Sequence, residues 1–285
     1  MLRTAAFVLA MLSGVATVSA ADVPSPSATY TQQIEQWRAA RVARLTAPTG
    51  WLSLIGLEWL NEGANRVGSA ADNVIVLKAG PAHLGTVTLA PDGGLHLALD
   101  PASGATVDGK AVTEAALVDD MHAAADAEPT TDAESRRHFL GIDYFPIDDA
   151  WRIEADWVPF TPPHDLAMGS VIGTIDTVKV PGKAVFRRDG HTFELLPYQE
   201  EPGGELFFVL ADRTSGKETY GAARFLYAAL PAGGLDHPGK VVLDFNKAYN
   251  PPCAFTSFAT CPLAPPENRL DVAITAGEKK YRGGH

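Results

Sequence analysis

The sequence predicts a mainly β protein that has one N-terminal helix followed by two antiparallel β units. Two observations carry this prediction. Short apolar runs recur from residue 65 onward, and Gly, Pro, Asp and Asn turns separate them. Residues 30–45 instead show the three- to four-residue apolar spacing of an amphipathic helix. We therefore expect an N-terminal helix, a first β-sandwich, and then a second antiparallel β-barrel or sandwich.

The composition is that of a folded chain with a sizeable core. It has 285 residues, of which 46% are hydrophobic, and a formal net charge of −11. Nucleic-acid binding needs clustered Lys and Arg, so this acidic balance argues against it. The usual motifs of serine hydrolases, zinc proteases, P-loop enzymes and dinucleotide-binding proteins are missing from the sequence. No cofactor is expected.

Residues 1–20 have the pattern of a secretory signal peptide. Arg3 gives a positive start, residues 5–12 form a short apolar stretch, and residues 18–20 (Val-Ser-Ala) suit cleavage after Ala20. No later stretch has the length of a membrane span. We expect a secreted or periplasmic protein, in which residues 21–29 are a flexible leader.

The helix predicted at Tyr30–Leu45 ends before Pro48. Arg38, Arg41 and Arg44 recur along one flank, which favours a solvated face, although an edge that faces an anion would show the same spacing. Residues 51–60 (WLSLIGLEWL) are expected to form a buried strand or a strand plus a turn. The two tryptophans are expected in the core, with a ligand platform as the alternative.

Strands with tight turns between them are predicted in the first β unit, at residues 74–77, 85–89 and 95–99. Residues 66–69 (RVGS), 73–77 (NVIVL), His83 and residues 107–109 (VDG) resemble a forkhead-associated (FHA) sandwich. In that family a Ser three residues before the His helps to bind phosphothreonine. This chain has Gly80 there and a negative Asp108 nearby, so the resemblance implies a shared scaffold and not phosphopeptide binding.

The expected boundaries follow from these patterns. The helix and the FHA-like sandwich occupy residues 30–118, an Ala/Asp-rich loop occupies residues 119–138, and the C-terminal antiparallel β domain occupies residues 139–285. Strands of the C-terminal domain are predicted at 151–158, 171–180, 183–186, 192–196, 205–210 and 270–275.

Three polar runs of the C-terminal domain, at residues 212–224, 244–253 and 261–279, hold the candidate ligand-binding side chains. Asp212 either caps a polar hairpin or faces a cavity together with Tyr220 and Arg224. Prolines stiffen the second and third runs, and a stiff loop positions side chains at little entropic cost. The candidates are Asp212, Thr219, Tyr220, Arg224, Asp244, Asn246, Tyr249, Asn250, Asn268, Glu278 and Lys279.

The chain has two cysteines, Cys253 and Cys261. In an exported chain they are expected to form a disulfide that staples a proline-rich loop. A free nucleophilic Cys253 is the alternative, but no histidine lies near it in the sequence. A metal site would need more ligands than these two thiols, so none is expected.

The chain also resembles the bacterial and archaeal DUF1684 family, roughly from Trp37 to Tyr281. The resemblance rests on residues 48–60, residues 144–148 (YFPID), the run from Asp212 to Gly221 with Arg224, and the long motif at residues 244–279. It implies no named activity. The family pattern has an Arg-rich strand before Tyr144, whereas residues 115–134 of this chain are rich in Ala and Asp.

The leading hypothesis is an exported protein that binds a small polar or anionic ligand in a pocket of the C-terminal β domain. The first alternative is a hydrolase-type enzyme, with Asp212 or Asp244 as base, Tyr220 as acid and Arg224 stabilising an oxyanion. The second is a structural or protein-interaction module whose polar side chains only satisfy one another.

Overall fold

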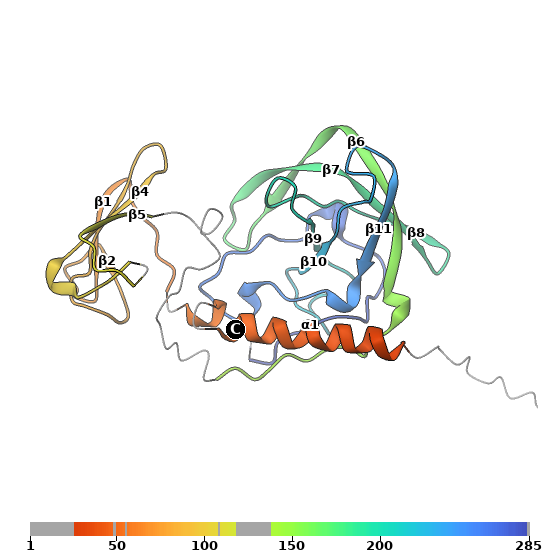
Figure 1. The fold of residues 1–285 in the computed structure, drawn as a ribbon, viewed down its shortest axis with the longest axis horizontal. Helices are drawn as coiled ribbons and strands as arrows, with labels where there is room; N and C mark the ends of the chain where they lie inside the picture. The colour runs from red at the N-terminus through yellow and green to blue at the C-terminus, as the bar shows by residue number, and fades with distance from the viewer. Residues whose placement is uncertain (1–25, 48–49, 55, 108, 118–137, 284–285) are drawn as a thin grey trace, which may run out of the picture.

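The computed structural model describes residues 26–283 apart from 48–49, 55, 108 and 118–137. The expected signal peptide, most of the leader and most of the Ala/Asp-rich loop therefore lie outside the described residues. Within them the chain is mainly β, with one N-terminal helix, several antiparallel sheets and no closed barrel. The predicted fold class is confirmed. Figure 1 shows a small N-terminal sheet at one end and a larger C-terminal unit with helix α1 along one side.

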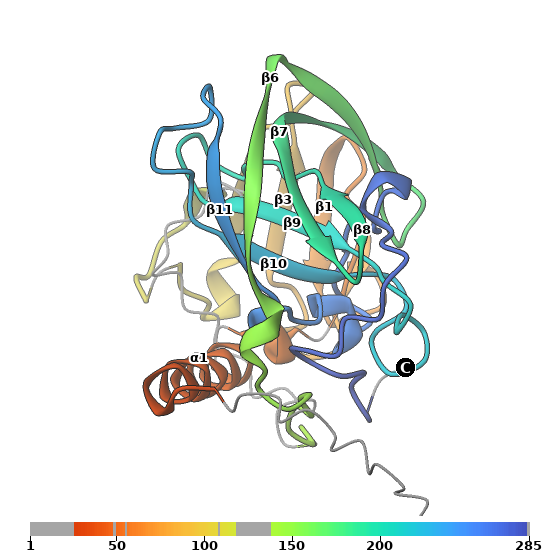
Figure 2. The same ribbon diagram turned by 90° about the vertical axis from the view of Figure 1, so that its right-hand side faces the viewer.

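Helix α1 spans Ala28–Thr46. It begins at Ser27, whose hydroxyl accepts a hydrogen bond from the backbone N–H of Tyr30. Ile34, Arg41 and Leu45 are buried because this face of α1 packs on the C-terminal unit (Figure 2). The expected solvated arginine face is therefore wrong for Arg41, and α1 contacts a part of the chain far from it in sequence.

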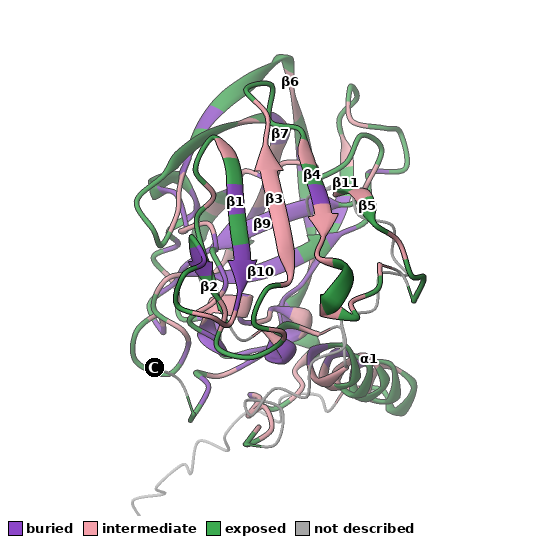
Figure 3. Ribbon diagram, turned by 90° about the vertical axis from the view of Figure 1, so that its left-hand side faces the viewer, coloured by how far each residue is buried: buried purple, intermediate pink, exposed green. Residues whose placement is uncertain are grey.

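The N-terminal sheet has the strand order β2-β1-β3-β4-β5. Its strands β3 and β4 have the predicted bounds. Because the described residues of this segment form a single sheet, the resemblance to an FHA sandwich is not confirmed and stays a prediction. Val67, Ile75 and Leu97 are its buried apolar residues (Figure 3). The bounds are β1 (Gly63–Gly68), β2 (Ile75–Val76), β3 (Gly85–Leu89), β4 (Leu95–Leu99) and β5 (Glu114–Leu117).

The buried strand predicted at residues 51–60 is wrong. A 3-10 turn, η1 (Trp51–Ser53), is followed by described chain that belongs to no strand. Trp51 is 39% exposed and Trp59 is 68% exposed, so neither tryptophan lies in the core. The segment joins α1 to the N-terminal sheet, and its described residues pair with no neighbouring strand.

The C-terminal unit contains a four-stranded sheet of order β11-β6-β7-β8 and a two-stranded sheet formed by β9 and β10. The predicted strand at residues 270–275 is not assigned as one: the only bridge near it joins Ala211 and Arg269. The bounds are β6 (Arg152–Gly169), β7 (Ile175–Arg188), β8 (His191–Leu195), β9 (Leu206–Leu210), β10 (Arg224–Ala228) and β11 (Gly239–Asp244).

Strand β9 is buried on both faces, which explains why its sequence is apolar at every position. Leu206, Phe208 and Leu210 pack towards the four-stranded sheet. Phe207 and Val209 point to the opposite side, into a second apolar cluster. Part of that second side borders the larger of the two cavities described below.

Candidate functional site

Arg224 lies at the start of β10 and is sealed in the core, with 1% of its surface exposed. Its Nη2 donates to Asp212 Oδ2 at 2.6 Å and to the Ile274 carbonyl at 3.0 Å. Its Nη1 donates to the Ala276 carbonyl at 2.5 Å. Burial lowers the pKa of Arg224, and the Asp212 carboxylate opposes that shift. The guanidinium is thus held by one carboxylate and two carbonyls, as a buried charge requires.

Asp212 uses its second oxygen to fold the hairpin that follows it. Oδ1 accepts hydrogen bonds from the Thr214 N–H at 2.8 Å and the Thr214 hydroxyl at 2.6 Å. The Thr219 hydroxyl lies 2.8 Å from the hydroxyl of Thr214. The predicted capping role of Asp212 is therefore confirmed, and the same carboxylate also balances Arg224.

Glu278 and Arg41 form a second buried ion pair, which fastens α1 to the C-terminal segment. Arg41 Nε donates to Glu278 Oε1 at 3.1 Å, and the Asn250 N–H donates to Oε2 at 2.8 Å. Arg41 Nη2 also donates to the Asn250 carbonyl at 2.8 Å. Burial raises the pKa of Glu278, while Arg41 pulls it down.

Asp244 and Asn246 fasten the first turns of α1. The Tyr30 hydroxyl donates to Asp244 Oδ1 at 2.7 Å, and Asn246 Nδ2 donates to that hydroxyl at 3.0 Å. Asn246 also pairs with the backbone of Asp148, accepting its N–H at 3.0 Å and donating to its carbonyl at 2.8 Å. Both side chains are therefore occupied by internal contacts.

Asn268 and Lys279 are also engaged internally. The Asn268 amide accepts the Leu196 N–H at 2.8 Å and donates to the Leu196 carbonyl at 2.9 Å. The Lys279 ammonium lies 4.7 Å from the centroid of the Phe145 ring. The Lys279 carbonyl accepts a hydrogen bond from the Asn250 side chain at 2.8 Å.

Cys253 and Cys261 are free thiols in this structure, so their pairing stays a prediction. The Cys253 N–H donates to Cys261 Sγ at 3.2 Å. The Tyr220 hydroxyl lies 3.7 Å from Cys253 Sγ and donates to the Cys253 carbonyl at 3.3 Å. A hydrogen bond with Cys261 lowers the pKa of the Cys253 thiol, against the opposing effect of burial.

The polar side chains singled out in the sequence therefore mostly satisfy one another. Among them, only Tyr249 lines either of the two cavities described next. The structure brings Asp212, Thr219 and Arg224 together in one cluster and Asn250 and Glu278 in another. It leaves Asn268 apart from both.

The larger cavity, here called the aromatic cavity, has a volume of about 840 Å³ and lies between α1 and the β9–β10 sheet. That volume is within the usual range for small-ligand sites. Its lining is rich in aromatic and cationic side chains, and two carboxylates, Glu200 and Glu205, also line it. The aromatic and cationic residues are Trp37, Arg41, Arg44, Trp51, Phe207, Phe225, Tyr227, Lys247 and Tyr249.

The floor of the aromatic cavity is a set of rings in mutual contact. Phe207 lies 4.9 Å from Phe225 and 4.7 Å from Tyr227, measured between ring centroids. Tyr249 meets Phe225 edge-on at 5.7 Å and lies 6.3 Å from Trp37 of α1. Such packing fixes the ring positions, so the cavity offers a preformed apolar surface.

Charged groups lie at the rim of the aromatic cavity. Arg44 is exposed and makes no hydrogen bond or ion pair with the described residues. Lys247 Nζ is 3.9 Å from Asp244 Oδ2 and remains partly exposed. The Tyr227 hydroxyl donates to Glu200. Burial raises the pKa of Tyr227 and of Tyr249, so both phenols are neutral near pH 7.

Sequence reasoning did not identify this cavity, although two local signals were present. Phe225 and Tyr227 are two residues apart on a strand and thus share a face. Trp37 and Arg44 are seven residues apart on a helix and share a flank. What the sequence does not show is that α1 covers the β9–β10 sheet.

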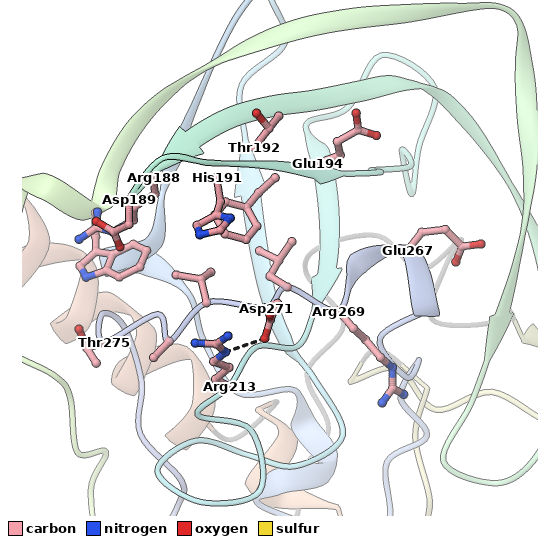
Figure 4. Close-up of a pocket in the computed structure, with 15 residues that line it drawn as sticks. Arg188, Asp189, His191, Thr192, Glu194, Arg213, Glu267, Arg269, Asp271 and Thr275 are labelled. Atoms are coloured by element: carbon pink, nitrogen blue, oxygen red, sulfur yellow. Dashed lines mark hydrogen bonds and ion pairs between the residues drawn. The ribbon is translucent and has the colours of Figure 1, made fainter.

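The second cavity, here called the edge groove, has a volume of about 790 Å³ and lies between β8 and residues 267–275. Figure 4 shows His191, Thr192 and Glu194 on the β8 side and Arg269, Asp271 and Thr275 on the facing segment. An exposed ion pair joins Arg213 Nε to Asp271 Oδ1 at 2.6 Å. None of the candidate side chains from the sequence lines this groove.

Two features are absent from the described residues. No group of three or more His, Cys, Asp or Glu side chains within that part of the chain is arranged to hold a metal ion. None of its helices has both the length and the apolar character of a membrane span.

Comparison with known proteins identifies the class of this chain. The model of the family described as "Protein of unknown function (DUF1684)" matches residues 137–279, about half of the chain. The chain belongs to this family. The matched range contains Asp212 and Glu278, the carboxylates of the two buried ion pairs. It also contains every strand of the C-terminal unit.

A solved relative is the solution NMR structure of an uncharacterised protein from Haloarcula marismortui. It is 30% identical and covers 52% of this chain and 80% of its own, with a TM-score of 0.43. No curated protein matches the chain.

Proposed function

We propose that this protein binds a small ligand with a flat, largely apolar body and an anionic group in the aromatic cavity. The observation that carries the proposal is the combination of a preformed ring floor with two incompletely paired cations, Arg44 and Lys247, at the rim. Rings give contact area at low entropic cost, and guanidinium and ammonium groups bind carboxylates or phosphates.

Export belongs to the same proposal. It rests on the signal-like pattern of residues 1–20, which would place the binding protein outside the cytoplasm. A Cys253–Cys261 disulfide would fit that compartment and would fix the loop next to Pro252, which lines the cavity. The FHA-like pattern of residues 66–109 has no part in the proposal.

The hydrolase alternative receives less support from the geometry. It needs Arg224 and Asp212 to face a substrate, and both are buried and paired with each other. Asp244 is occupied by the Tyr30 hydroxyl. The other alternative is a structural or protein-interaction module without a small-molecule site. The binding test below distinguishes it from the proposed binding protein.

The test is a thermal-shift screen of the mature form, residues 21–285, against carboxylates and phosphates that carry an aromatic or sugar ring. A ligand at a hundred times its Kd raises the stability by about 2.7 kcal/mol. Any hit is then titrated by tryptophan fluorescence, because Trp37 and Trp51 line the cavity. The Trp37→Phe variant should lose part of the signal change, since Trp51 remains in the lining.

Three variants decide whether the hit occupies this cavity. Arg44→Ala and Lys247→Ala should each weaken binding about tenfold or more, since hydrogen bonds to charged groups contribute roughly 1.5–3 kcal/mol. Arg213→Ala is the matched control, because it removes an exposed arginine that lines only the edge groove. If no compound shifts the melting temperature, or if Arg213→Ala is the variant that loses binding, the proposal is wrong.

A further inference from the structure

The lining of the aromatic cavity keeps its opposite charges apart. Arg41 and Arg44 come from α1, and Lys247 comes from the segment that follows β11. The carboxylates of the lining, Glu200 and Glu205, come from the chain just before β9. In the described part of the chain, no ion pair joins any of these cations to either carboxylate. Both signs of charge therefore line one cavity without neutralising each other.

Strand pairing explains this separation. Tyr198 bridges Phe207 of β9, and Phe207 pairs with Tyr227 of β10. On the other edge of β10, Phe225 bridges Tyr249. The carboxylates belong to the first two of these four segments, whereas the cations belong to the last one and to the helix packed on it. Neighbouring strands lie about 4.8 Å apart, so roughly 10 Å separates β9 from the segment at Tyr249, and the ring floor covers this distance.

The two carboxylates flank one short turn. The turn is closed by the Gly204 N–H, which donates to the Glu201 carbonyl at 3.0 Å. Glu200 accepts the Tyr227 hydroxyl, whereas Glu205 is exposed and makes no hydrogen bond or ion pair with the described residues. Like charges at neighbouring positions repel each other, so both carboxylates would stabilise a cation bound here. The Tyr227 ring beside them offers an aromatic face that also attracts cations.

At the opposite side of the cavity, Arg41 has a hydrogen-bond donor left for a ligand. Its side chain is only 8% exposed, lines the cavity, and has Cζ 4.6 Å from the centroid of the Tyr249 ring. Nε donates to Glu278 and Nη2 to the Asn250 carbonyl, but Nη1 makes no hydrogen bond within the described chain. A free donor on a nearly buried guanidinium points to an anionic group in the cavity, with Arg44 about one turn further along α1.

We infer that the ligand of the aromatic cavity is dipolar: a flat ring that carries an anionic group at one end and an ammonium group at the other. The anionic group would bind Arg41 and Arg44. The ring would lie on Phe207 and Tyr227, and the ammonium group would reach Glu205. This inference rests on the proposed function and adds the second charge and its position. It gives a role to carboxylates that would repel a ligand with anionic groups alone.

The test compares three small ring compounds by NMR titration of the mature form, residues 21–285, at low ionic strength. 4-(Aminomethyl)benzoate is dipolar, 4-ethylbenzoate has the same shape without the ammonium group, and terephthalate has a carboxylate at both ends. The aminomethyl compound should bind about tenfold more tightly than the ethyl compound, and terephthalate should bind most weakly. Without a carboxylate contact the ethyl compound should bind more tightly than the aminomethyl compound, because an ammonium group loses hydration in an apolar cavity.

Two glutamates at the same turn supply the protein variants. Glu205→Gln should remove the advantage of the aminomethyl compound. Glu201→Gln is the matched control and should keep that advantage, because Glu201 is exposed and does not line the cavity. Glu205→Lys should reverse the preference, so that terephthalate binds more tightly than the aminomethyl compound. Both side chains are exposed, so these variants should keep the melting temperature of the wild type within a few degrees.

Three results would overturn the inference. If 4-ethylbenzoate binds as tightly as the aminomethyl compound and loses affinity in Arg44→Ala, the ligand is only anionic, and the proposed function stands without this addition. If Glu205→Gln and Glu201→Gln weaken binding equally, the effect comes from net charge and not from a contact in the cavity. If none of the three compounds binds, the inference is wrong, and the proposed function is then judged by the wider thermal-shift screen.

Discussion

The buried ion pairs and the aromatic cavity meet at Arg41, yet they use polar groups in opposite ways. In the ion pairs, Arg224 and Glu278 are almost completely removed from water, and their hydrogen-bonding groups are largely taken by protein atoms. In the aromatic cavity, Arg44 and Lys247 remain exposed at the edge of an apolar surface. The buried ion pairs stabilise the fold, whereas the exposed cations of the aromatic cavity can still bind a ligand.

This difference teaches that density of polar residues in a sequence does not by itself mark a binding site. Runs such as residues 212–224 are polar because a loop-rich unit must satisfy many buried backbone groups. A site instead needs groups that the protein leaves incompletely paired. Variants of the buried ion pairs should change stability, and variants of the aromatic cavity should change binding. Measuring both properties for each variant therefore tests the comparison directly.

The largest effect is expected at Arg224. The Arg224→Met variant leaves the buried Asp212 carboxylate without its partner, which should lower the free energy of unfolding by about 3–5 kcal/mol. Urea unfolding followed by circular dichroism measures the loss. The double variant with Asp212→Leu should recover part of it, because no unpaired charge then remains. A single variant as stable as the wild type would show that this pair does not hold the unit together.

The second comparison uses two arginines on one helix. Arg41→Ala removes the partner of Glu278 and should cost about 1.5–3 kcal/mol of stability. Arg44→Ala, one turn later, should change stability by less than about 0.5 kcal/mol while weakening ligand binding. Equal losses of stability in the two variants would contradict the division between a structural region and a binding region.

Much of the fold was predictable because its signals are local. Strand β9 shows its burial on both faces as an uninterrupted apolar run, and α1 shows its buried face as regular spacing. The capping role of Asp212 was predictable for the same reason, since Asp212 and Thr214 are two residues apart.

The candidate site could not be predicted in the same way. Arg41 meets Glu278 across 237 positions of sequence, and nothing local to either residue indicates the other. The aromatic cavity depends on that docking of α1, because Trp37 and Arg44 reach the β9–β10 sheet only through it. The strand predicted at residues 51–60 was wrong for a related reason: the described residues of this segment find no partner strand.

The smallest expected effect concerns Glu278, which belongs to the buried ion pairs. It is a dependence of the free energy of unfolding on pH. Its carboxyl titrates near 4.5 in the unfolded chain, and burial raises the pKa in the folded protein. Between these two values the folded state binds more protons, so the stability contributed by Glu278 falls as the pH rises through this window.

Replacing Glu278 with Gln removes this titration. The wild type should lose stability relative to Glu278→Gln as the pH rises from about 4.5, by roughly 1.4 kcal/mol for each unit of difference between the two pKa values. Urea unfolding of both proteins between pH 4 and 8 measures the difference, in which all other titrating groups cancel. The opposite slope would mean that Arg41 and Arg224 outweigh burial, and that the two buried ion pairs act as one network of four charges.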